Sequence, residues 1–200
     1  MLRLLLIIFC IASYSSANAQ LIEFDKLDTA TMFSSIKEAL ENPQKVYRLD
    51  LSKKKLTKFP TEILQFSNLN ELILDKNKID SIPSSIASLS NLQRLSIYRN
   101  KLVNIDFITV LPNLVEIDLT ANYIEAIPSD IANLFKLKVL ILQLNTITEF
   151  PISMREIKIL EKFNLLDNDL NREQQHRIRA MFPDIKVEMS APCNCNYDEE

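Results

Sequence analysis

Apolar and polar positions follow an eleven-residue pattern along the chain, apolar-x-x-apolar-x-apolar-x-x-Asn-x-apolar, which recurs several times. The clear copies are Leu69–Ile79, Leu92–Leu102, Leu114–Ile124, Leu137–Ile147 and Leu160–Leu170. A weaker first copy runs from Val46 to Leu56. The alternation within each copy predicts a short strand with one buried face. Because the copies begin 22 or 23 residues apart, they predict similar units stacked in sequence order.

A single unit is too small to fold alone. In the unit that begins at Leu69, the apolar positions are Leu69, Leu72, Leu74, Ile79, Ile82, Ile86 and Leu89. Burying each of these side chains contributes roughly 1.5–3 kcal/mol, whereas ordering the backbone costs roughly 1–2 kcal/mol for every residue of the unit. We therefore expect only the array to be stable, because its units share one core and one parallel sheet.

The second half of four units carries a further pattern, apolar-Pro-x-x-apolar. It occurs at Phe59–Ile63, Ile82–Ile86, Ile127–Ile131 and Phe150–Met154. With both patterns, residues 46–170 resemble the leucine-rich repeat family in six units, with the 22–23-residue repeats of its secreted bacterial members. The resemblance implies a right-handed α/β solenoid, a horseshoe segment with a parallel β-sheet on its concave face. It also implies irregular or short helical segments on the convex side and helical caps at both ends.

One unit departs from this pattern. The third clear copy, which begins at Leu114, follows a unit of 22 residues in which Asp106-Phe107-Ile108 replaces the proline step. We expect a different turn on the convex side at this point.

An asparagine occupies the ninth position of five units. These residues are Asn77, Asn100, Asn122, Asn145 and Asn168. An asparagine side chain has amide donors and a carbonyl acceptor, so it can close the turn after a strand by bonding backbone groups. This is the role that the family resemblance implies, and we interpret the asparagine ladder as scaffold.

The composition excludes several classes of catalytic and binding site. The chain of 200 residues has no glycine and one histidine. Without glycine it lacks glycine-rich phosphate loops, the dinucleotide-binding fingerprint and the nucleophile elbow, and one histidine cannot form a multi-histidine metal site. The net charge of −3 argues against a nucleic-acid partner. We therefore expect a protein that is not an enzyme and that uses no cofactor and no metal.

Residues 1–19 have the layout of a signal peptide. Arg3 precedes the apolar run Leu4–Ile11, and Ala17-Asn18-Ala19 is a small-x-small cleavage site. The run is too short to span a bilayer, and a buried N-terminal helix is the alternative. We expect cleavage between Ala19 and Gln20, a secreted or periplasmic product, and no membrane span in the mature chain.

Residues 20–45 are predicted to form an N-terminal capping helix, because the end of a stacked core must be shielded from water. Asp28 or Thr29 would begin this helix, and Asn42-Pro43 would end it. Its apolar face would consist of Met32, Phe33, Ile36, Ala39 and Leu40.

Residues 171–189 are predicted to close the other end with a helix and an edge strand. The helix begins at the capping-box pattern Asn171-Arg172-Glu173-Gln174, and Ile185, Val187 and Met189 alternate as in a strand.

Residues 190–200 are predicted to be a flexible polar tail, which holds Cys193 and Cys195. An oxidising compartment permits a disulfide between these two cysteines, although so short a ring is strained. Bridging between molecules is the alternative.

Side chains that alternate outward on each strand are left free to meet a partner. In strand order they are Arg48, Asp50, Ser52; Glu71, Ile73, Asp75; Arg94, Ser96, Tyr98; Glu116, Asp118, Thr120; Val139, Ile141, Gln143; and Lys162, Asn164, Leu166. The first strands present a mosaic of charges, whereas the strand with Val139 and Ile141 presents apolar side chains. Contiguous exposed apolar residues often mark a contact site.

We therefore predict a protein-binding face on the concave side. Its apolar centre would be Tyr98, Val139, Ile141, Leu144 and Leu166, and its charged rim would be Arg94, Glu116, Asp118 and Lys162. Packing of these residues against the tail, or against another copy, is the alternative.

The favoured function is a non-enzymatic protein-recognition module exported from a bacterial cell, with a protein ligand. A self-associating architectural envelope protein is one alternative. Glycan binding would favour concave aromatic residues, and Tyr98 is the one aromatic residue among the outward positions. Hydrolysis would require two converging carboxylates, which the set Asp50, Asp75, Glu116 and Asp118 could supply. A solvated charge mosaic is the favoured interpretation of that set.

Overall fold

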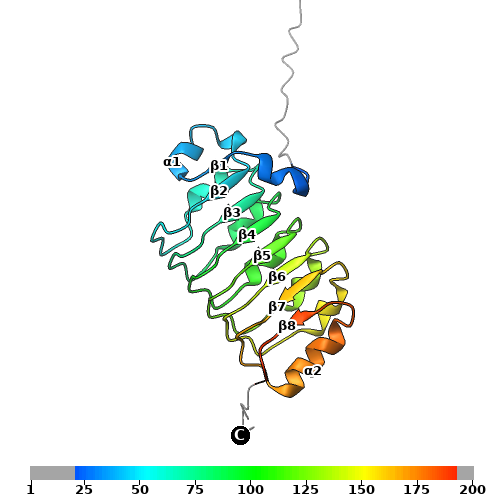
Figure 1. The fold of residues 1–200 in the computed structure, drawn as a ribbon. Coiled ribbons are helices and arrows are strands. Elements are labelled where there is room, and N and C mark those ends of the chain that lie inside the picture. Colours follow the sequence, from blue (N-terminus) through cyan, green and yellow to red (C-terminus); the bar gives the residue numbers. More distant parts are fainter. Residues whose placement is uncertain (1–20, 193–200) are drawn as a thin grey trace, which may run out of the picture.

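Eight parallel strands form one sheet in the order of the sequence, from β1 to β8, in a computed structural model that describes residues 21–192. Figure 1 shows the strands stacked one after another along the molecule. The expected parallel sheet of a leucine-rich repeat solenoid is thus confirmed. The predicted signal peptide, Cys193 and Cys195 lie outside the described residues.

Each repeat contributes a strand of three residues. These are β2 (Arg48–Asp50), β3 (Glu71–Ile73), β4 (Arg94–Ser96), β5 (Glu116–Asp118), β6 (Val139–Ile141) and β7 (Lys162–Asn164). They pair without any shift, so that residues at the same repeat position stand side by side across the sheet. The middle residue of every strand is buried. We call the sheet face that points away from the core the concave face.

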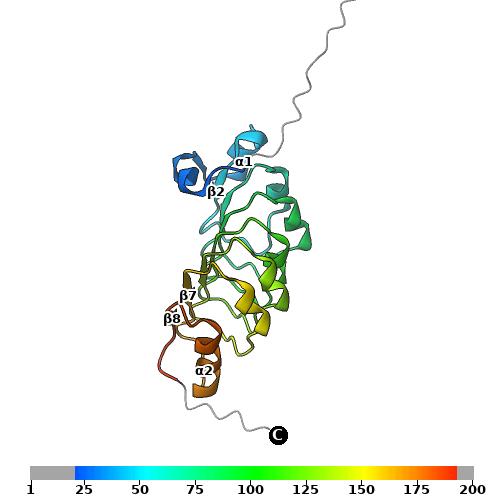
Figure 2. The ribbon, with the colours of Figure 1, turned by 90° about the vertical axis from the view of Figure 1, so that its right-hand side faces the viewer.

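The convex side carries a row of 3-10 helices, and Figure 2 shows this row across from the sheet. They are η3 (Thr61–Gln65), η4 (Ser84–Ser88), η5 (Asp106–Val110), η6 (Ser129–Asn133) and η7 (Ile152–Glu156). A proline with extended backbone precedes four of them. Ile105 precedes η5 with φ −126° and ψ 19°, so the expected difference lies in the backbone that enters this turn. The helix itself has the same length, five residues, as its neighbours.

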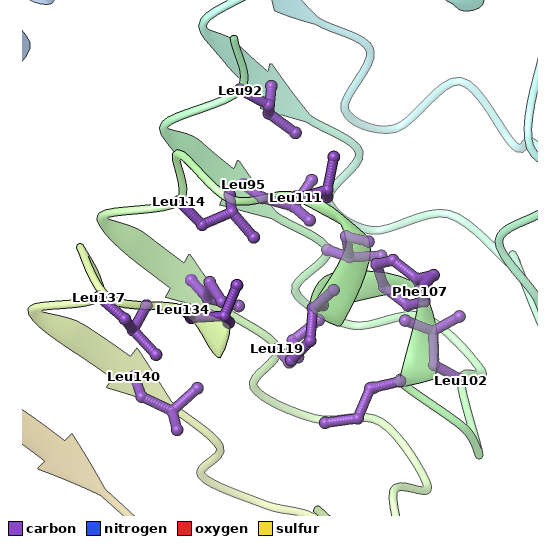
Figure 3. Packing of buried hydrophobic residues seen from close by; sticks show 14 of the residues in the cluster. Leu92, Leu95, Leu102, Phe107, Leu111, Leu114, Leu119, Leu134, Leu137 and Leu140 are labelled. Carbon is purple, nitrogen blue, oxygen red and sulfur yellow. The ribbon is translucent and has the colours of Figure 1, made fainter. Parts of the chain in front are cut away.

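The core lies between the sheet and the row of 3-10 helices. Figure 3 shows Leu95 and Leu140 projecting from the sheet into the layer that also holds Phe107 and Leu134 from the convex side. Apart from Leu27 and Val115, the buried apolar residues form one cluster that continues from Ala39 to Phe182. Each unit therefore buries its apolar side chains against those of its neighbours, as a stacked array requires.

The asparagine ladder bonds the backbone of consecutive units. Asn122 Nδ2 donates to the carbonyls of Ile97 (2.9 Å) and Leu119 (3.0 Å), and Asn122 Oδ1 accepts from the amide of Leu102 at 3.0 Å. Equivalent hydrogen bonds are made by Asn77, Asn100, Asn145 and Asn168. Each asparagine thus satisfies buried backbone groups that would otherwise destabilise the fold by about 1–3 kcal/mol apiece.

The residue before each ladder asparagine has a left-handed backbone. The φ angles are 55° at Lys76, 53° at Arg99, 57° at Ala121, 55° at Leu144 and 56° at Asp167. Side chains with a Cβ pay roughly 1–2 kcal/mol in this region. A chain without glycine therefore carries a small strain in every unit, which the shared core offsets.

The N-terminal cap differs from the single helix that we expected. It consists of η1 (Phe24–Thr29), β1 (Met32–Phe33), α1 (Ile36–Ala39) and η2 (Pro43–Lys45). Met32 and Phe33 pair with β2 instead of lying on a helix face. The reason is that β2 would otherwise leave a row of backbone donors and acceptors unpaired at the sheet edge.

The C-terminal cap contains the expected helix and strand. Helix α2 (Arg172–Met181) begins with a capping box between Asn171 and Gln174. Strand β8 (Val187–Glu188) pairs with β7, and the rings of Phe163 and Phe182 pack edge to face with centroids 5.5 Å apart. Among residues 21–192, no helix has both the length and the apolar character needed to cross a membrane.

Candidate functional site

The first position of the concave face forms a row of alternating charges. Arg48, Glu71, Arg94 and Glu116 stand side by side on β2 to β5. Arg48 Nε donates to Glu71 Oε2, Arg94 Nη1 donates to Glu71 Oε1 at 3.2 Å, and Arg94 Nε donates to Glu116 Oε2 at 2.8 Å. Glu71 is only 3% exposed. This part of the face is therefore a hydrogen-bonded network, and Glu116, one of the four carboxylates interpreted as a solvated mosaic, is ion-paired in it.

The N-terminal segment, residues 22–30, closes over this network. Asp28 Oδ1 accepts from Arg48 Nη2 at 2.8 Å and from Arg94 Nη1 at 3.0 Å. The ring of Phe24 lies 5.0 Å from the guanidinium carbon of Arg94. Figure 2 shows η1 on the sheet side of the molecule at its N-terminal end. The segment thus occupies the part of the concave face over β2 to β4.

Hydrogen bonds between the backbone of Ile22 and two side chains hold the same segment at the start of β3 and β4. The amide of Ile22 donates to Asn70 Oδ1 at 3.1 Å, and Gln93 Nε2 donates to the carbonyl of Ile22 at 2.7 Å. The pKa of Asp28 is lowered, first by its hydrogen bond with Arg94 and then by the charges of Arg94 and Arg48. Geometry and charge both tie the segment to the sheet.

An open cavity of about 260 Å³ lies over β3 to β6, and Glu71, Arg94 and Glu116 of the network form part of its lining. Its apolar side chains include Ile73, Val139 and Ile141, and its acidic side chains include Asp75 and Asp118. Ile73, Ser96, Asp118 and Ile141 occupy one row of paired positions across four strands. The cavity therefore combines apolar contacts with unneutralised carboxylates.

Asp75 is the most perturbed carboxylate of this cavity. Burial raises the pKa of Asp75, and the charges of Asp118 and Asp50 raise it further. Hydrogen bonds from Ser96 Oγ (2.6 Å) and from the amide of Tyr98 (3.0 Å) act in the opposite direction. In the part of the chain that the structure describes, neither Asp75 nor Asp118 forms an ion pair.

The structure brings some of the predicted site residues together and separates others. Val139, Ile141, Glu116, Asp118 and Arg94 all line the cavity. Four others lie outside its lining: Tyr98, Leu144, Leu166 and Lys162.

Leu144 and Leu166, which follow β6 and β7, form an outer strip, whereas Tyr98 follows β4 and Lys162 begins β7 beside Val139. The Tyr98 ring has Lys76 Nζ at 5.6 Å and the Arg99 guanidinium carbon at 5.4 Å. Leu144 is 47% exposed, and its amide donates to the carbonyl of Leu166. The strip thus adds accessible apolar surface after β6 and β7.

Two sequence expectations about neighbours need revision. Lys162 was predicted in the same charged rim as Glu116 and Asp118, but β6 stands between its strand and β5, and Glu116 pairs with Arg94. Ile73 was not included in the predicted centre, although it lines the cavity with Ile141. Both isoleucines occupy the second outward position of their strands, which was the available signal.

No group of three or more His, Cys, Asp and Glu side chains within residues 21–192 is arranged to hold a metal ion.

Two family models match the sequence. The one described as Leucine rich repeat matches residues 44–105, and the one described as Leucine Rich repeats (2 copies) matches residues 90–133. The comparison with curated proteins found no match.

Solved structures from two bacteria and a plant have a similar fold. A leucine-rich repeat protein of Leptospira interrogans is 24% identical, with a TM-score of 0.64 over 82% of this chain and 49% of that chain. Internalin C2 of Listeria monocytogenes is 25% identical, with a TM-score of 0.64 over 76% of this chain and 64% of that chain.

The plant structure is the ectodomain of the receptor kinase GASSHO1/SCHENGEN3 of Arabidopsis thaliana, in complex with CASPARIAN STRIP INTEGRITY FACTOR 2. It is 23% identical, with a TM-score of 0.62 over 78% of this chain and 20% of that chain. The present chain spans about half the length of the Leptospira protein. The repeat pattern, the parallel sheet and both family models agree: over residues 44–133 the chain matches the leucine-rich repeat family, and its fold is that of a leucine-rich repeat solenoid.

Proposed function

We propose that this protein is a non-enzymatic recognition module that binds a protein partner on its concave face. The observation that carries the proposal is the cavity over β3 to β6, where Ile73, Val139 and Ile141 remain partly accessible beside Asp118. Apolar side chains at the centre of a patch with charged neighbours are the usual anatomy of a protein-binding hot spot.

The other half of the same face supports this location by contrast. The N-terminal segment already covers the network around Glu71 and Arg94, so that a partner would meet the cavity and the outer strip first. Among the similar structures, the plant ectodomain was solved in complex with CASPARIAN STRIP INTEGRITY FACTOR 2. Because the two chains share a fold, this complex supports the proposal that the present fold can bind a partner.

A hydrolytic role for the concave carboxylates is less favoured. Glu116 is ion-paired with Arg94, and Asp75 accepts hydrogen bonds from Ser96 and from the amide of Tyr98. Hydrolysis needs one protonated and one charged carboxyl group poised across a substrate. The open cavity, with its apolar side chains, suits contact with a partner better.

The test replaces the apolar contact without adding charge. The double variant Val139→Asn and Ile141→Asn should lose capture of envelope or surface proteins in a pull-down, because it removes apolar area from the centre of the cavity. The matched control is Phe135→Asn, since Phe135 is 72% exposed and lies outside the cavity lining. Thermal unfolding must show that both variants remain folded.

Unchanged capture by the folded double variant would reject the site. Light scattering of the purified protein separates the architectural alternative, which requires self-association in the absence of any other protein. In keeping with the predicted signal peptide, we propose that the protein meets its partner outside the cytoplasm.

A further inference from the structure

The cavity has an uncompensated negative charge. The two arginines of the face, Arg48 and Arg94, are held by Glu71, Asp28 and Glu116. Two arginines against three carboxylates leave that network with one excess negative charge. The network therefore does not neutralise the other carboxylates of the cavity.

The remaining carboxylates of the face add to this excess. Asp50, Asp75 and Asp118 form no ion pair within residues 21–192, and the charges of Asp50 and Asp118 both disfavour the ionised form of Asp75. Arg94 lines the cavity but is already ion-paired, and Lys76 and Arg99 lie against the Tyr98 ring. A positive group from outside would relieve the repulsion.

Apolar surface lies on both sides of the acidic position. In the paired row across the sheet, Asp118 is next to Ile141, and Ser96 separates it from Ile73. Neighbouring strands are roughly 4.8 Å apart, and side chains on one side of an extended peptide repeat at roughly 6.6 Å. A peptide that crosses the strands can thus place one side chain near Asp118 and another, two positions along, against Ile141 or Val139.

We propose that the cavity recognises an extended protein segment with a lysine or arginine two positions from an aliphatic residue. The basic group pairs with Asp118 and Asp75, and the aliphatic side chain packs on Ile141 and Val139. This inference rests on the proposed function and adds to it the chemistry of the partner. Charge complementarity selects a basic segment over an acidic or neutral one.

The hydrogen bonds of the two aspartates make the site testable without disturbing the fold. Asp75 accepts from Ser96 Oγ and from the Tyr98 amide, and Asp118 accepts from the Thr120 amide at 2.9 Å. An asparagine side-chain oxygen can accept the same hydrogen bonds. The double variant Asp75→Asn and Asp118→Asn therefore removes the charge and keeps the local structure.

The experiment selects a phage-displayed library of random twelve-residue peptides on the purified protein and, in parallel, on this double variant. Peptides from the native protein should be enriched in lysine or arginine two positions from leucine, isoleucine or valine. Synthetic versions should bind the double variant at least about tenfold more weakly, and their affinity for the native protein should fall as salt rises.

The outcomes separate this inference from the proposed function. One outcome is a set of peptides that fail to bind the Val139→Asn and Ile141→Asn variant but bind the aspartate variant as well as the native protein. That result would support the proposed binding face and reject the inference that the partner is basic. Selection of acidic or purely apolar peptides would do the same. Peptides insensitive to both variants would overturn both proposals.

A second copy of the chain is a further outcome that the experiment must detect. Lys53, Lys54 and Lys55 form an exposed basic run after Leu51, and such a run could enter the cavity of another molecule. Light scattering would reveal this as concentration-dependent dimers that the aspartate variant does not form and that the selected peptides dissociate. Such dimers would assign the cavity to self-association and reject the inference of another protein as partner.

Discussion

The two halves of the concave face have the same backbone and different uses. Over β2 to β4, Arg48, Glu71 and Arg94 bond one another and the residues of the N-terminal segment. Over β6 and β7, Val139, Ile141 and Leu144 remain partly or largely accessible. The strands pair in the same register throughout.

This difference shows that the outward positions of a repeat sheet do not form a uniform binding surface. In the first half, those positions stabilise the end of the array by holding its cap. In the second half, the apolar outward residues contribute little to the core, so another role explains them better. Position in the array, rather than repeat chemistry, decides which outward residues are available to a partner.

The largest expected effect is on stability in the covered half. Glu71→Gln should lower the free energy of unfolding by about 3 kcal/mol, because it leaves two partly buried arginines without their shared carboxylate. Urea unfolding measures this. The control is Glu161→Gln, whose exposed pair with Lys138 should contribute less than about 1 kcal/mol. Equal, small losses in both variants would mean that the network does not stabilise the covered half.

An intermediate effect, opposite in sign, is expected in the open half. Leu144→Gly should raise the free energy of unfolding by about 1 kcal/mol, because glycine removes the strain of a left-handed backbone at φ 55°. It should also weaken partner binding, since it deletes an exposed apolar side chain of the outer strip.

Ala121→Gly is the matched control for this variant. Its backbone has nearly the same φ of 57°, so a similar gain in stability is expected, while binding should not change. Equal binding of the partner by both glycine variants would remove Leu144 from the binding face.

The smallest expected effect concerns the attachment of the N-terminal segment. Asp28→Asn should lower the free energy of unfolding by less than about 1 kcal/mol, because the Asp28 side chain is 66% exposed. The pKa of Asp28 is lowered in the folded state, so its contribution is complete above the ordinary value of 3.8 and is lost as the pH falls through the lowered pKa.

Unfolding midpoints of the native protein and of Asp28→Asn should therefore differ near pH 7 and converge in acid. High salt at pH 7 should reduce the same difference, because the ion pair is exposed. A difference that persisted in acid would assign the effect to packing of the segment and not to the charge of Asp28.

Much of the fold was predictable because the buried positions repeat. Leu72, Leu95 and Leu140 share one position in their units, and the same position is buried each time. A second ladder was present in the sequence but was not recognised. Asn68, Asn91 and Asn113 precede their strands and donate to the carbonyls of Gln44 (2.7 Å), Ser67 (3.2 Å) and Ser90 (2.8 Å) in the preceding coils. Asparagine at a fixed distance before three consecutive units was the available signal.

The cap and the composition of the cavity were less predictable because they depend on contacts between distant residues. Asp28 meets Arg94 across 66 positions of sequence, a contact that no local pattern specifies. Met32 and Phe33 have spacing compatible with a helix face, yet pairing with the open edge of β2 satisfies their backbone in a strand.

The sequence by itself determined the stacked units, their in-register strands and the buried asparagine ladder, because a 22- or 23-residue period places the same side chain in the same environment each time. Only the tertiary structure decided which outward residues the N-terminal segment covers and which ones line the cavity with Asp75 and Asp118. The physical reason is that burial in the core repeats with the chain, whereas coverage of the concave face depends on where its ends fold back.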